Sequence, residues 1–200
     1  MSLQVLVLGG SGVLGRAVLA QIHHAGVAAT FTYFRNRDVA DSVQAELGCQ
    51  GYCTDLRDPD GVPALFVSLE RDGRLPDTVI HCAGVAPVAA LETISTDAWD
   101  QLHAIHGRAS LQCAQEMVRC GAKGSLVLVS ALDGILPVPA PAHYAASQAA
   151  LWGLTQALAK EIGPKGILVN MALIGVLEGG ISAALDPKLR ESYGRHAALG

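Results

Sequence analysis

Tyr144 and Gln148 are the residues whose types and spacing bear most directly on chemistry. They lie four positions apart in "HYAASQAAL", so both side chains would project from one face of a helix. A free phenol has a pKa of ~10, and a nearby cation would lower it toward neutrality. Glutamine has no charge to supply that effect, although its amide can donate a hydrogen bond. The pair therefore predicts a neutral tyrosine that gives a proton more readily than it takes one.

A glycine-rich stretch near the N-terminus is the second candidate site. In "LVLGGSGVLGRAV", Gly10, Gly12 and Gly15 have the spacing GxGxxG, and counting from Gly9 gives a close variant. Between a strand and a helix, such glycines permit a tight turn and a close approach to a pyrophosphate, which faces free N–H groups of the helix. A purely structural turn is the alternative. The residues expected to hold a dinucleotide here are Gly9, Ser11, Gly12, Val13, Leu14 and Gly15.

Arginine follows the second predicted strand, where sites of this kind bind the adenosine ribose. The segment is "YFRNR", with Arg35 at the strand end, Arg37 beside it and no carboxylate. A carboxylate would favour the free 2′-hydroxyl of NAD, whereas arginine suits a 2′-phosphate. We therefore predict NADP(H) as the cofactor, with Arg35 on the phosphate. The alternative is that Arg35 is a solvated charge at the end of a strand.

Strand-like and helix-like segments alternate along the chain and would position these residues. Helical patterns separate apolar segments, including 38–47, a helix begun by Asp58 and Pro59, and a long helix over 95–122. This alternation predicts an α/β, Rossmann-type fold, a doubly wound parallel sheet with helices on both faces. Ligands should bind at the carboxyl ends of its strands. The predicted strands are 3–8, 27–34, 49–54, 77–84, 124–130 and 167–173.

Size, composition and charge bound the remaining functions. The 200 residues are 50% hydrophobic and carry a net charge of −4, which suits one domain over 1–200 and disfavours nucleic acid as a partner. No apolar stretch reaches the ~18–20 residues of a membrane span, and the N-terminus lacks a signal-peptide pattern. We expect a cytoplasmic protein. The five cysteines form no CxxC pair, so free thiols and no metal are expected.

Over essentially its whole length the chain resembles the short-chain dehydrogenase/reductase family. The glycine loop, "DL" (55–56), "HCAG" (81–84) and Tyr144 occur in that family's order and spacing, and "AKEIGPKGILVN" (159–170) is similar to its segment before strand six. The segments "RNRDVADSVQAEL" and "GLTQALAKEIGPKGI" look most like 3-oxoacyl-acyl-carrier-protein reductases. The resemblance implies further cofactor contacts at Asp55, Leu56, Cys82, Ala83, Gly84, Tyr144 and Gln148.

The resemblance also implies a catalytic tetrad, of which Tyr144 alone matches. The family's lysine falls on Gln148, its serine on Ala131 and its asparagine on His106. Ser130, one residue early, would replace the serine if the loop shifts. His106 would either carry protons, since imidazole titrates near pH ~6.5, or be an ordinary hydrogen-bonded histidine of a helix. The expected catalytic residues are thus Tyr144, Ser130, His106 and Gln148.

The sequence is compatible with three functions. The first is an NADP(H)-dependent reductase that converts a 3-oxoacyl thioester, or another small-molecule or carrier-bound keto group, to the alcohol. The second is a catalytically inactive subunit of the same fold that pairs with an active ketoreductase, and the third is an NADP(H) sensor. In the family, the helix of Tyr144 forms a dimer interface, and the small residues Ala145, Ala149, Ala150 and Gly153 would serve that purpose or pack inside the subunit.

Two further expectations concern the periphery of the site. His143 should take a surface role, because it points to a different helix face from Tyr144. The variable lid of the family falls on 177–194, where the sequence has no chemical signature. If the chain ends at Gly200, it lacks the family's last helix and strand, and the edge of its sheet needs a partner.

Overall fold

Six parallel strands form one sheet in the computed structural model, which describes residues 3–132, 140–184, 186–188 and 190–191. The order across the sheet is β3-β2-β1-β4-β5-β6, and every neighbouring pair is parallel. The predicted strands are confirmed, with ends that differ by a few residues. They are β1 (Gln4–Leu8), β2 (Ala28–Tyr33), β3 (Gln50–Cys53), β4 (Thr78–His81), β5 (Gly124–Ala131) and β6 (Ile167–Ile174).

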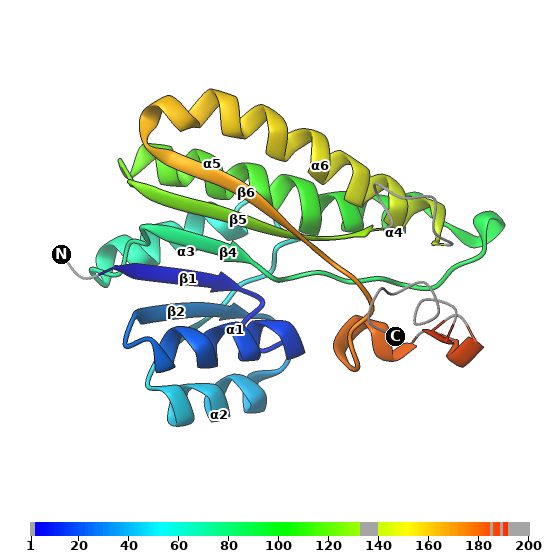
Figure 1. Ribbon diagram of the computed structural model, residues 1–200, viewed down its shortest axis with the longest axis horizontal. Helices are drawn as coiled ribbons and strands as arrows, with labels where there is room; N and C mark the ends of the chain where they lie inside the picture. Colours follow the sequence, from blue (N-terminus) through cyan, green and yellow to red (C-terminus); the bar gives the residue numbers. More distant parts are fainter. Residues whose placement is uncertain (1–2, 133–139, 185, 189, 192–200) are drawn as a thin grey trace.

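Helices lie on both faces of this sheet, which confirms the doubly wound arrangement (Figure 1). One face carries α1 (Val13–His24) and α2 (Arg37–Leu47). The opposite face carries α3 (Gly61–Arg71), α5 (Ala109–Arg119) and α6 (Ala142–Ile162). The shorter helices are α4 (Thr96–His103) and the 3₁₀ helices η1 (Leu91–Thr93), η4 (Gly163–Lys165) and η5 (Gly180–Ala184).

Each face of the sheet has its own hydrophobic core. The larger core packs β1, β4, β5 and β6 against α3, α5 and α6, with Phe66 and Met117 fully buried. The smaller core packs β1 and β2 against α1 and α2 around Phe31. Among the described residues no helix covers β5 and β6 on the α1 side, where Leu168 is 63% exposed (Figure 1). Within the described part of the chain, β1 contributes buried side chains to both cores.

The long helix predicted over 95–122 is interrupted, which corrects the sequence expectation. A π-helical turn, η2 (Ala104–Arg108), separates α4 from α5. The Ser110 hydroxyl donates to the carbonyl of His106 at 2.6 Å, inside this turn. The apolar pattern of this segment did not reveal the bulge, and π turns often occur at functional sites. His106 lies in this turn.

The predicted start of the third helix at Asp58 was also wrong, because α3 begins at Gly61 after Asp60. Asp58 instead accepts a hydrogen bond from the N–H of Asp60 at 2.9 Å and forms the preceding turn. A Cβ at Gly61 would lie 2.3 Å from the carbonyl oxygen of Asp55. The chain thus makes a close turn after β3 before the helix can start.

Candidate functional site

A cavity of 540 Å³ opens at the carboxyl ends of the strands, where the fold predicts a ligand. Its nucleotide side is lined by the glycine turn and by the chain after β4, with Gly12, Val13, Leu14, Gly15, Cys82, Ala83 and Gly84. Its chemical side is lined by His106, Ser130, Tyr144 and Gln148. The structure therefore brings most of the predicted site residues to one cavity. Gly9, Ser11, Arg35, Asp55 and Leu56 are not among the lining residues.

The glycine turn has the geometry that a phosphate requires. Gly9 has φ +78°, and a Cβ there would lie 2.7 Å from the Cα of Ala83. A Cβ at Gly15 would lie 2.2 Å from the carbonyl oxygen of Gly9. Gly12 caps α1 with no side-chain hydrogen bond, so the first N–H groups of the helix remain available on the cavity side. These residues fit the pyrophosphate of a dinucleotide.

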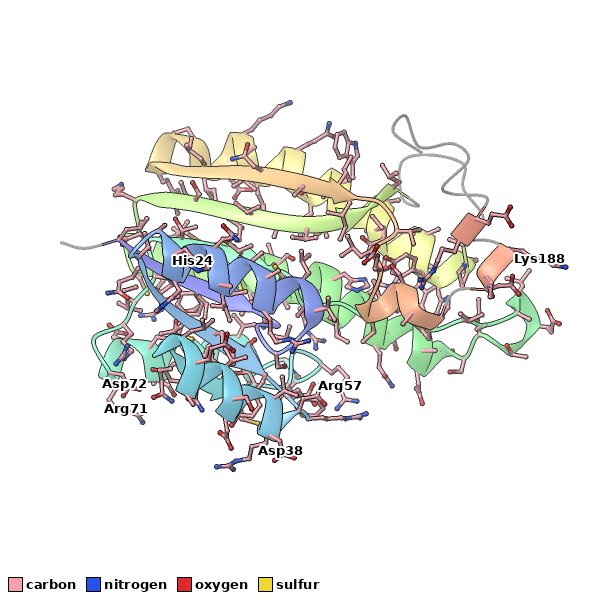
Figure 2. The ribbon with its side chains drawn as sticks, turned by 60° about the horizontal axis from the view of Figure 1, so that its bottom comes forward. His24, Asp38, Arg57, Arg71, Asp72 and Lys188 are labelled. Carbon is pink, nitrogen blue, oxygen red and sulfur yellow. The ribbon has the colours of Figure 1, made fainter. Side chains whose placement is uncertain are left out.

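Phe34 and two arginines gather beyond the end of β2. The guanidinium carbon of Arg35 lies 5.3 Å from the Phe34 ring centroid, and that of Arg57 lies 4.9 Å from it. Arg57 was not predicted from the sequence, because it follows β3 and only the fold brings it beside β2. Figure 2 shows Arg57 on the lower side of the molecule, well apart from Arg71 and Asp72. Two cations therefore flank one exposed ring near the predicted 2′-phosphate position.

Arg57 also holds Asp55, which the family resemblance assigns to the cofactor. Its Nε and terminal nitrogen donate to Oδ1 and Oδ2 of Asp55 at 2.9 and 2.7 Å. These bonds, with the charges of Arg57 and Arg35, hold the pKa of Asp55 below its usual value. Leu56 is buried at 7% exposure. The Asp55 carboxylate is therefore an oriented anion next to two arginines.

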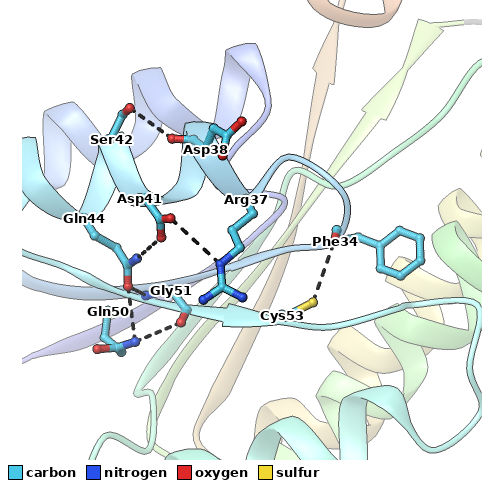
Figure 3. A network of polar contacts seen from close by, with 9 residues as sticks. All are labelled: Phe34, Arg37, Asp38, Asp41, Ser42, Gln44, Gln50, Gly51 and Cys53. Atoms are coloured by element: carbon cyan, nitrogen blue, oxygen red, sulfur yellow. Dashed lines mark hydrogen bonds and ion pairs between the residues drawn. The ribbon is translucent and has the colours of Figure 1, made fainter.

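Arg37, the other arginine of "YFRNR", has a different partner. Its Nε lies 3.9 Å from Asp41 one turn along α2, and both side chains are exposed (Figure 3). In the same network Gln44 accepts from the backbone N–H of Gly51 at 2.9 Å and so fastens α2 to β3. Arg37 thus belongs to the helix surface, and Arg35 remains the arginine at the strand end.

Gln148 lies at the centre of the chemical side. Its Oε1 accepts from the Ser130 hydroxyl at 2.8 Å and from the backbone N–H of Ala131 at 3.1 Å. Its Nε2 lies 3.1 Å from Nδ1 of His106. The amide oxygen is therefore fully used, and one N–H of the amide is left for the cavity. The single proton of Ser130 is directed at Gln148.

His106 joins the π turn to α6. Its Nδ1 lies 2.9 Å from the hydroxyl of Ser147, which in turn lies 2.8 Å from the carbonyl oxygen of Tyr144. Burial, followed by the neighbouring imidazoles of His81 and His103, lowers the pKa of His106 to about 3. The side chain is thus neutral near pH 7. This favours the hydrogen-bonded histidine over the proton carrier.

Tyr144 faces His106 within the cavity wall. It is 6% exposed, and its ring meets the imidazole edge-on, with 5.9 Å between the centroids. The expectation that His143 takes a surface role was wrong, because that side chain is 1% exposed. The first turn of α6 buries two successive residues, so helix-face geometry alone did not predict it. His81, in β4, is also buried, which lowers its pKa to about 4.

The small-residue face of α6 is open in the single chain. Ala149, Ala150 and Gly153 are exposed, and Trp152 beside them is 39% exposed. Ala145 is half-buried. The alternative that this face packs inside the subunit is therefore wrong for Ala149, Ala150 and Gly153. Part of the predicted lid, η5, lines the cavity, with Gly180 beside Val13. Residues 185, 189 and 192–194 lie outside the described residues.

Outside the cavity, the described residues do not meet the requirements of a membrane span, a metal site or a disulfide. No helix among them is long and apolar enough to cross a membrane. In the described part of the chain, no group of three or more His, Cys, Asp or Glu side chains is arranged to hold a metal ion. The five cysteines are free thiols.

Comparisons with known proteins agree with this geometry. Residues 11–200 match the family described as enoyl-(acyl carrier protein) reductase. The chain is 30% identical to the cyclic-di-GMP-binding biofilm dispersal mediator protein of Escherichia coli, over 92% of this chain and 76% of that one. It is 25% identical to the 3-oxoacyl-(acyl-carrier-protein) reductase FabG of Staphylococcus aureus, over 96% and 81%.

A solved structure shows the same likeness in three dimensions. It is a short-chain dehydrogenase from Burkholderia cenocepacia in complex with NADP, with a TM-score of 0.89 and 27% identity over 98% of this chain and 82% of that one. The order of the six strands accords with this likeness. The chain belongs to the short-chain dehydrogenase/reductase family.

Proposed function

We propose that the chain is a single dinucleotide-binding domain that uses NADP(H) to reduce a keto group, such as that of a 3-oxoacyl thioester, at an atypical active site. One observation carries the proposal: the glycine turn and Tyr144 line the same cavity. The relatives named for 3-oxoacyl reduction and for NADP support the substrate class and the cofactor. The arginines around Phe34 support NADP(H) over NAD(H).

The residues present fit that cofactor. The glycine turn would hold the pyrophosphate, Arg35 and Arg57 would face the adenosine phosphate, and Tyr144 would lie near the reacting carbonyl. A bound nicotinamide would supply the hydride. Tyr144 would donate the proton to the carbonyl oxygen as a neutral phenol, since Gln148 provides no cation to lower its pKa. The departures from the family's tetrad at Gln148, Ala131 and His106 make the site atypical.

Turnover by the purified chain tests this proposal. We expect oxidation of NADPH in the presence of a short 3-oxoacyl thioester, and a fall of about 100-fold or more in turnover with Tyr144→Phe. The mutant should still bind NADPH. Tyr52→Phe is the matched control, because its hydroxyl bonds Asp72 at the far end of α3. An unchanged rate with Tyr144→Phe would contradict a catalytic tyrosine.

A catalytically inactive subunit is the second candidate. It is favoured because the Gln148 amide bonds Ser130 and His106 within the protein rather than a ligand. The exposed face of Ala149, Ala150 and Gly153 would then pair with an active ketoreductase, whereas the reductase would use it for a homo-oligomer. An NADP(H) sensor is the third. Binding of NADPH without turnover on keto substrates would favour these two, and absence of NADPH binding would exclude the reductase and the sensor.

A further inference from the structure

The turn before α3, residues 55–60, is held together by local hydrogen bonds. Asp55 accepts from the backbone N–H of Arg57 at 2.9 Å and from its guanidinium at 2.9 and 2.7 Å. The N–H of Asp58 donates to the carbonyl of Asp55 at 3.2 Å, and that of Gly61 donates to the carbonyl of Asp58 at 3.1 Å. These bonds fix the shape of the turn, but they do not fix where it lies against the rest of the molecule.

Two side chains of the neighbouring helix fasten this turn. A terminal nitrogen of Arg108, in the π turn η2, donates to the carbonyl of Arg57. Nε2 of Gln112, in α5, donates to the carbonyl of Pro59 at 2.6 Å. The two donors are four residues apart, so one face of the helix presents both. Arg108 thus holds the backbone of the residue whose guanidinium lies over the ring of Phe34.

Arg108 gains little stability from its other surroundings. In the described part of the chain its guanidinium pairs with no carboxylate. Its Nε is buried and has no hydrogen-bond partner there, and burying a donor without a partner costs free energy. The position that Arg108 gives to Arg57 therefore accounts for this arginine better than a contribution to stability does.

The π turn directs its residues to two sites. His106 lines the cavity, whereas Arg108, two positions later and so on roughly the opposite side of the helix, bonds the turn after β3. We infer that Arg108 is a positioning residue: its bond to the carbonyl of Arg57 sets where the Arg57 guanidinium lies beside Phe34, and thereby the affinity for a 2′-phosphate. The second step rests on the proposed function, in which Arg57 faces that phosphate.

Proton NMR of the ligand-free protein tests the first step. Protons over an aromatic ring are shifted upfield by its ring current, so the side chain of Arg57 reports its place above Phe34. The shift is measured as the difference from Phe34→Leu protein, and the signals are assigned by their loss in Arg57→Lys. We expect folded Arg108→Met protein to lose at least half of this shift. An unchanged shift would overturn the inference.

Arg119→Met is the matched control for Arg108→Met. It removes the same charge from the last turn of α5, where the side chain pairs with Glu70 and Glu116, and it should leave the Arg57 signals unchanged. Equal losses of the ring-current shift in both variants would show that loss of charge, rather than the bond from Arg108, moves Arg57. If Arg108→Met does not fold, Arg108→Gln is the second variant, because its side chain is shorter but still polar.

Cofactor titration tests the second step. Arg108→Met should raise the Kd for NADPH about fivefold and that for NADH less than twofold, because only NADPH carries the phosphate that Arg57 would face. In Arg57→Met protein the same substitution should change the Kd for NADPH less than twofold, since Arg108 then has no guanidinium to position. A full fivefold loss in that background would show that Arg108 acts through its own charge and would overturn the second step. If the unmodified chain does not bind NADPH, the proposed function and the second step both fail, and the ring-current shift still decides whether Arg108 positions Arg57.

Discussion

The nucleotide side of the cavity offers mainly backbone groups to a ligand, whereas the chemical side offers mainly side chains. The glycine turn works through its backbone, with free N–H groups at the start of α1 and no Cβ at Gly9 or Gly15. The chemical side works through side chains that bond one another across 18 to 42 residues of sequence. At the glycine turn, most substitutions would introduce a side chain where the backbone leaves no space. In a network of side chains, several residues can be replaced together while the hydrogen bonds between them are kept.

The chemical side of this chain is such a network. Gln148 and His106 both stand where the family resemblance places other residues, and they bond each other at 3.1 Å. Ser130, Ala131 and Ser147 join the same network. The residues that the resemblance places at the tetrad positions are thus parts of one hydrogen-bonded arrangement in the cavity wall, beside Tyr144.

The largest expected effect comes from a substitution in the glycine turn that forces the backbone to move. Gly15→Ala places a Cβ 2.2 Å from the carbonyl oxygen of Gly9, and backbone cannot move aside cheaply. We expect a loss of about 3 kcal/mol in the free energy of unfolding. Thermal denaturation should show a Tm lower by roughly 6–12 °C.

Gly12→Ala is the matched control for that substitution. Its Cβ would meet only the carbonyl oxygen of Gly9, at 3.2 Å, and it lies on the cavity. The Tm should change little, while the Kd for NADPH should rise about tenfold or more because the methyl group occupies the approach of the pyrophosphate. Equal losses of stability in both variants would contradict a turn shaped for a ligand at Gly12.

The same contrast explains how far the sequence could predict the molecule. The spacing of apolar residues and of glycines reflects local backbone geometry. These spacings therefore predicted the six strands, their alternation with helices and the turn from Gly9 to Gly15. They did not predict the π turn of His106 or the later start of α3, where specific contacts override the pattern. Arg57 and Ser147 were missed because only tertiary packing brings them to Phe34 and His106.

Acid should destabilise the folded chain. His81 and His106 have pKa values of about 4 and about 3 in the folded chain, below the ordinary 6.5. The unfolded chain therefore binds protons more readily, and stability is lost as the pH falls below ~6.5. Between pH 7 and pH 5 we expect a loss of roughly 2 kcal/mol for each imidazole.

Denaturant unfolding across this pH range measures the effect. His106→Asn should remove about half of the acid loss, and His24→Asn, on the exposed end of α1 (Figure 2), should remove none. If His106→Asn loses as much free energy of unfolding between pH 7 and pH 5 as the unmodified chain, then His106 does not contribute to the loss of stability in acid.

The smallest expected effect concerns the selectivity of the nucleotide side. Arg35→Ala should raise the Kd for NADPH about tenfold and leave that for NADH unchanged, because a charge-assisted bond to the 2′-phosphate is lost while Arg57 remains. Arg37→Ala removes the same charge from a side chain paired with Asp41 and should change the Kd for NADPH less than twofold. Equal losses of NADPH affinity in the two variants would mean that the positive charge of the arginines in general, rather than contact with Arg35, sets the preference for NADPH. Both losses of affinity should then disappear at high salt.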